Sequence, residues 1–122
     1  MAITIAELIG KKNEIRAKKE ALYDLETSVG TITCSVPDAA LVAEAWDMQD
    51  TSEGNKHLVF SCCIDPNLKD KELLAAYECS EPFDIVTEIF QAGEVAKIAG
   101  HLLKLAGFNG NVTSKLHQSA KN

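Results

Sequence analysis

The stretch from His57 to Asn67, HLVFSCCIDPN, carries the apolar pattern on which the fold depends. Two adjacent cysteines, Cys62 and Cys63, extend an apolar run that begins at Leu58, and the stretch closes on an Asp–Pro pair. The spacing predicts a helix whose buried stripe includes both thiols. Because Asp followed by Pro is a helix-start signal, the next helix begins either at this pair or near Asp70.

A metal or thiol site is the alternative explanation of the same stretch. Nitrogen and sulfur ligands of the kind that zinc takes are offered by His57, Cys62, Cys63 and Cys79. Adjacent helical residues point about 100° apart, however, so the paired cysteines do not easily face one ion. A reactive thiol also needs a nearby cation or a helix N-terminus, whereas this pair lies at a helix C-terminus. We therefore expect core thiols, and no catalytic residue, metal or cofactor.

Upstream, residues 25–36 change from a helical to an alternating period. Ile32, Cys34 and Val36 are separated by single polar residues, which predicts a half-buried strand. Leu25–Thr27 is the expected hairpin partner. This strand or hairpin is the one small β element that the sequence predicts.

The chain as a whole is predicted to form about six short helices, including the one in the opening stretch. One begins after the cap residue Asp38 and places Trp46 in the core, and Ser52 and Gly54 mark a break behind it. The last helix has the most regular apolar stripe and ends at Gly107, a left-handed C-cap. The fold class expected is mainly α, a compact domain of short helices.

Length and composition fit one domain spanning residues 1–122. With 46% hydrophobic residues, a chain of 122 residues can bury its own core. No apolar run approaches the ~20 residues that span a bilayer, and the N-terminal charges follow the apolar segment, unlike a secretory signal. We expect a complete cytoplasmic protein with no membrane partner. The polar tail, residues 108–122, is expected to be loosely ordered.

Residues 1–23 form a basic N-terminal helix in this interpretation, started by a capping box between Thr4 and Glu7. Its narrow apolar stripe repeats every seven residues, at Leu8, Ile15 and Leu22. A narrow stripe buries less than a core helix does, so it is typical of an arm or of a helix that pairs with another chain.

Charge separates this helix from the rest of the chain. The first 20 residues carry five bases against three acids, and the remainder carries seven bases against 15 acids. The acidic body disfavours nucleic acid as a partner. The basic helix suits docking on acidic segments, within the chain or between copies. A small regulatory protein that binds DNA through this helix is the alternative.

The order of several motifs resembles a known family. These motifs are AWDMQD (Ala45–Asp50), DPNLKDKELLAAYEC (Asp65–Cys79), EPFDIVTEIFQAGEVAKIA (Glu81–Ala99), KLAG (Lys104–Gly107), and, before them, ELIGKKNEIRAKKEALY (Glu7–Tyr23) and GTITCSVP. Together they resemble the phage XkdN-like tail-assembly chaperones from about Thr4 to Gly107.

This resemblance implies a protein that is not an enzyme. Such chaperones of tailed phages and prophage-like elements bind the tape-measure protein and keep it soluble before the tail tube polymerises. They act in the host cytoplasm, are absent from the mature virion, and other copies of the same chain are further candidate partners. Exposure arguments, rather than the resemblance, nominate the protein-binding residues: Leu8, Ile15, Leu22, Tyr23, Tyr77, Phe83 and Phe108.

Overall fold

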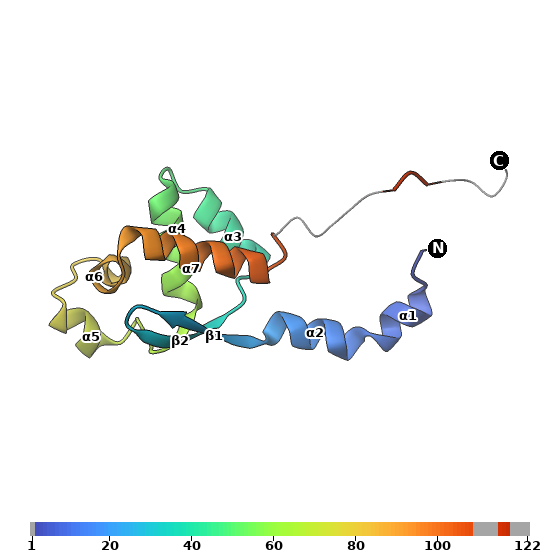
Figure 1. The fold of residues 1–122 in the computed structure, drawn as a ribbon, viewed down its shortest axis with the longest axis horizontal. Helices are drawn as coiled ribbons and strands as arrows, with labels where there is room; N and C mark the ends of the chain where they lie inside the picture. The colour runs from blue at the N-terminus through green and yellow to red at the C-terminus, as the bar shows by residue number, and fades with distance from the viewer. Residues whose placement is uncertain (1, 109–114, 118–122) are drawn as a thin grey trace.

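The structure is a computed structural model, and it describes residues 2–108 and 115–117 (Figure 1). Its elements in chain order are α1 (Ile5–Gly10), α2 (Lys12–Glu20), β1 (Leu22–Thr27), β2 (Gly30–Ser35), α3 (Ala39–Trp46), α4 (Thr51–Cys62), β3 (Cys63–Asp65), α5 (Lys71–Ala76), the 3₁₀ helix η1 (Pro82–Asp84), α6 (Ile85–Ile89) and α7 (Ala92–Leu105). The mainly α class is confirmed. The β element is larger than predicted, because the strands form a three-stranded sheet. Most of the predicted loose tail lies outside the described residues.

The sheet is antiparallel, in the order β1-β2-β3. The β1–β2 hairpin runs in register from the Leu22–Ser35 pair to the Thr27–Gly30 pair, so β1 starts earlier than the predicted Leu25. Gly30 has a φ of 130°, a backbone conformation that residues with a Cβ rarely adopt. The hairpin predicted from alternation is thus present and longer than expected.

The third strand corrects the prediction for the central cysteines. Helix α4 ends at Cys62, and Cys63 begins β3 opposite Cys34 of β2. Both Cys62 and Cys63 are nevertheless buried. Pairing with β2 imposes an extended backbone on a segment whose side-chain pattern alone also fits a helix.

Helix α4 is the centre of the core, in contact with α3, α6, α7 and β3. The predicted break at Ser52 and Gly54 is wrong, because both residues lie inside α4, which begins after the cap residue Asp50. A Cβ on Gly54 would lie 2.5 Å from the carbonyl oxygen of Ala45 on α3. Glycine is therefore required here for close helix packing rather than for chain termination.

Helix ends follow the predicted caps. The Asp38 carboxylate accepts the backbone N–H of Leu41, and Asp70 caps α5 in the same way. Of the two alternatives, a helix start near Asp70 is therefore the correct one. Gly107 is left-handed, with a φ of 98°, and Phe108 N–H donates to the Leu103 carbonyl at 2.9 Å. These bonds form a Schellman motif that ends α7.

The N-terminal arm, defined as residues 2–20, differs from the predicted continuous helix. Its capping box is present, but the helix is interrupted at Lys11 and α2 ends at Glu20. Leu22 and Tyr23 lie on β1, because strand pairing with β2 takes over after Ala21. Every residue of the arm is exposed. Figure 1 shows α1 and α2 extending away from the packed helices and the sheet.

Candidate functional site

Exposed apolar side chains form the first candidate surface, on the arm. Ile5 is 77% exposed and Ile9 68%, and Leu8 and Ile15 are also exposed. None of them contacts a core, since α1 and α2 contain no buried residue. Leu8 and Ile15 were predicted as binding residues, whereas Ile5 and Ile9 were not. Their position beside Leu8 on the first helical turns is the signal that would have added them.

A second exposed group, the aromatic pair, consists of Trp46 at the end of α3 and Phe108 after α7. Trp46 is 61% exposed, which corrects its predicted place in the core. The two rings meet edge to face with centroids 4.9 Å apart. The Schellman motif at Gly107 fixes the backbone that brings Phe108 to the tryptophan. Because α3 ends at Trp46, the helix stripe no longer covers the indole, and this end position is the signal that sequence reasoning missed.

The other predicted residues lie apart from these two groups. Leu22 is exposed on β1, and its neighbour Tyr23 is half-buried on the opposite face of the strand. Tyr77 is exposed at the end of α5. Phe83 is half-buried, with ring centroids 4.8 Å from Phe60 and 5.3 Å from His57, and so closes the edge of the core. In Figure 1, α5 and α6 lie at the end of the molecule opposite the arm. The structure therefore does not gather the predicted residues into one patch.

The thiols are part of the core. Cys34, Cys62 and Cys63 are buried, and the Cys79 side chain packs against the same cluster. The hydrogen bond with Cys63, together with burial, raises the pKa of Cys34. Burial raises the pKa of Cys62 to about 11. Cys34 and Cys62 are therefore protonated at neutral pH, which disfavours nucleophilic attack by either of them, whereas the hydrogen bond with Cys34 lowers the pKa of Cys63. Over the described ranges, no group of three or more His, Cys, Asp or Glu side chains is placed to hold a metal ion.

Polar contacts around α4 join neighbouring elements. His57 Nε2 lies 3.0 Å from a Glu44 carboxylate oxygen, which connects α4 to α3. The Lys56 ammonium donates to Asp84 of η1 at 3.1 Å and also pairs with Glu53. The Nδ1 atom of His57 is buried without a partner. These contacts join α4 to α3 and to η1, and they are best explained as packing between elements.

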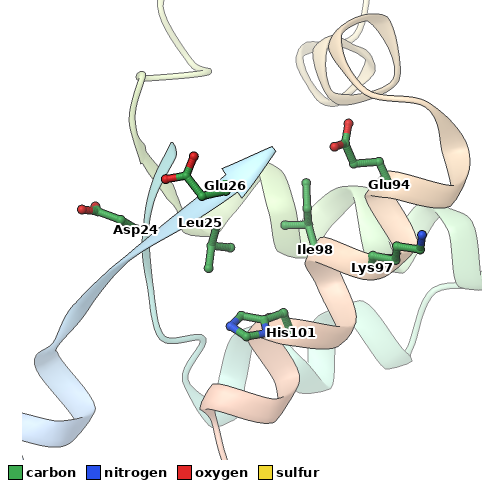
Figure 2. Close-up of a pocket in the computed structure, with 7 residues that line it drawn as sticks. All are labelled: Asp24, Leu25, Glu26, Glu94, Lys97, Ile98 and His101. Carbon is green, nitrogen blue, oxygen red and sulfur yellow. The ribbon is translucent and has the colours of Figure 1, made fainter. Parts of the chain in front are cut away.

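A shallow cleft of about 350 Å³ lies between β1 and α7. Figure 2 shows Leu25 and Ile98 between the strand and the helix, whereas the Asp24 and Glu26 side chains leave the other side of β1. On α7, the Glu94 carboxylate accepts both the backbone N–H and the hydroxyl of Ser28, at 2.8 and 2.6 Å. These bonds lower the pKa of Glu94 and hold the hairpin tip against α7. The cleft is thus a seam between two elements.

Across residues 2–108 and 115–117, no helix has the length and the apolar composition that crossing a membrane would need. The structure is thus that of a small, mainly helical protein with buried thiols and with apolar side chains exposed on the arm and in the aromatic pair.

The chain belongs to the phage XkdN-like tail assembly chaperone family, whose model matches residues 41–121. The match begins in α3, so the arm and the β1–β2 hairpin precede it. The similarity of motifs upstream of Leu41 is therefore outside the matched region. The family is not an enzyme family. No curated protein and no solved structure gave a match.

Proposed function

We propose that this chain binds the tape-measure protein of its phage or prophage-like element and keeps it soluble before the tail tube polymerises. The observation that carries the proposal is the family match, which extends over the helical body from α3 onward. A tail assembly chaperone needs a partner among the tail proteins. Among the tail proteins we favour the tape-measure protein, because it is a long helical chain, and such chains aggregate when their apolar faces are left uncovered.

The exposed aromatic pair is the part of the body best suited to contact such a helix. Trp46 and Phe108 present two large rings side by side, and aromatic side chains dominate the energetics of protein interfaces. Tyr77, exposed on another part of the body, is a separate contact in this proposal. Several copies along one extended partner gain avidity, so each contact can be weak enough for release when the tube assembles.

Co-expression tests the proposal. The tape-measure protein from the same gene cluster is produced with and without this chain, and its soluble fraction is measured. We expect this chain to raise the soluble fraction, and Trp46→Ala combined with Phe108→Ala to abolish the gain. Val29→Ala, at a residue 59% exposed on the hairpin turn, is the matched control and retains it. Equal solubility with and without the chain contradicts the proposal.

We also propose that the protein acts in the cytoplasm of the host and is not part of the mature virion. An assembly factor that leaves when the tube closes is present in infected or induced cells and absent from purified particles. Mass spectrometry of both samples, with the tube protein as the positive control, checks this. Recovery of the chain at a fixed ratio to the tube protein in purified particles would exclude it.

A further inference from the structure

We infer that the arm of one copy docks on the outer face of the three-stranded sheet of a second copy, through α2. The occupant of that face is therefore a second copy of this chain. This inference concerns self-association and does not depend on the tape-measure protein, so it stands or fails separately from the proposed function.

The donor surface on α2 consists of the apolar side chain of Ile15 and the lysines that surround it. Ile15 is 40% exposed, and residues three and four positions away on either side share its helix face. Each of those four positions holds a lysine: Lys11, Lys12, Lys18 and Lys19. A short apolar contact with a cationic rim is thus presented to solvent, with no buried neighbour on the arm.

The acceptor surface is the sheet face that points away from the core. On β1 the burial alternates, with Asp24 and Glu26 exposed and Leu25 turned toward α7, as Figure 2 shows. The hydroxyl of Thr33 donates to Asp24 at 2.8 Å, and that of Thr31 donates to Glu26 at 2.7 Å. These bonds hold both carboxylates along the face.

The acceptor face carries one sign of charge. Asp65 of β3 pairs with Thr33 and adds a third exposed carboxylate, and none of the three strands contains a lysine or an arginine. Leu22, 55% exposed, supplies an apolar side chain at one end of the face. The lysine rim of α2 and this acidic face are complementary in charge, which favours encounter and selects the orientation.

The arm of the same copy cannot reach this face without breaking the sheet. Only Ala21 separates Glu20, the last residue of α2, from Leu22, the first residue of β1, and Ala21 is itself extended. A reversal of the helix onto its own strand would require the Leu22–Ser35 pairing to open. Since the donor and acceptor surfaces differ, docking is either reciprocal, in a two-fold dimer, or head-to-tail, in chains or rings.

Charge exchange in the full-length protein tests this inference. Sedimentation velocity measures self-association of the wild type over a concentration series at low and high salt. We expect association that weakens as salt rises, because exposed charges are screened. Lys12→Glu with Lys19→Glu, and separately Asp24→Lys with Glu26→Lys, should each weaken it about tenfold or more. Far-UV circular dichroism checks that each variant is folded.

Mixing the two double variants is the decisive step. Each alone opposes like charges, but in the mixture the acidic arm of one variant meets the basic sheet of the other, so association should return. A wild type that stays monomeric at every concentration, or a mixture that remains dissociated, overturns the inference.

A photo-crosslinker at Ile15 provides a readout that does not depend on charge reversal. In a mixture of isotopically light and heavy chains, Ile15→p-benzoyl-phenylalanine should cross-link to residues 22–35 of a different chain. Cross-links within one chain, or cross-links that form only to co-expressed tape-measure protein or to added duplex DNA, contradict docking between copies.

Discussion

The arm and the body of this molecule are stabilised in different ways. The body buries its large apolar side chains around α4, whereas the arm has six-residue and nine-residue helices with no buried residue. Isolated helices shorter than about 12–15 residues are marginal in water. The body is therefore stabilised by its own contacts, and the arm depends on its cap and on whatever it docks against.

The sharpest contrast compares one leucine from each region. Leu58 on α4 is 1% exposed, so Leu58→Ala should lower the free energy of unfolding by about 3 kcal/mol. Leu8 on α1 is 47% exposed, and Leu8→Ala should change it by less than about 0.5 kcal/mol. Urea unfolding of the dilute protein followed by Trp46 fluorescence measures both. Equal losses would mean that the arm packs on the body in solution.

Two helical glycines separate close packing from simple helix propensity. A Cβ at Gly54 would meet the Ala45 carbonyl, so Gly54→Ala should destabilise the body by about 2 kcal/mol. A Cβ at Gly100 on α7 would meet no atom outside its own helix backbone within 4 Å, so Gly100→Ala should stabilise the body by about 0.5–1 kcal/mol. Thermal unfolding of the two variants gives shifts of opposite sign. A neutral Gly54→Ala would show that α3 and α4 can separate without cost.

The free energy of unfolding of the body should fall at alkaline pH, because the buried Cys62 thiol has a raised pKa. Its pKa is raised from 9.0 in the unfolded chain to about 11 when buried, so the unfolded state releases its proton first as pH rises. The stabilisation that the protonated Cys62 thiol supplies is complete below about pH 9 and is lost between pH 9 and 11. At about pH 10 the loss in the free energy of unfolding is about 1.4 kcal/mol. Urea unfolding with reductant at pH 8 and 10, for the wild type and Cys62→Ala, isolates it. An identical pH dependence in the variant contradicts this assignment.

The smallest effect is expected at the arm cap. Thr4→Ala removes the hydroxyl that accepts the Glu7 N–H, which costs α1 about 1 kcal/mol. The melting temperature of the body should not change, because α1 makes no contact with it. Backbone chemical shifts of residues 5–10 in dilute protein report the loss of helix. A lowered melting temperature would instead couple the arm to the core.

Sequence patterns predicted those parts of the fold whose signals are local. The alternation around Ile32 was sufficient for the hairpin, and Asp38 and Gly107 marked helix ends correctly. Each of these depends on the backbone preferences of a few neighbouring residues. The spacing of Leu8 and Ile15 likewise indicated an exposed apolar stripe, whereas Leu22, the third residue of that pattern, lies on β1.

The errors arose where distant contacts decide the structure. Cys63 is extended because β2 lies beside it, and Gly54 is a packing position because α3 lies across it. Trp46 shares the stripe of a core helix but occupies its last residue, beyond the cover of the body. The aromatic pair was missed for that reason, and also because its second ring, Phe108, comes from a part of the chain far away in sequence.

The single-residue junction at Ala21 has a mechanical consequence. A load applied to a held arm would run along the axis of β1, perpendicular to the hydrogen bonds that join it to β2 over the six pairs from Leu22–Ser35 to Thr27–Gly30. Those bonds would be sheared together instead of being peeled open one at a time. The hairpin would therefore resist tension transmitted through the arm.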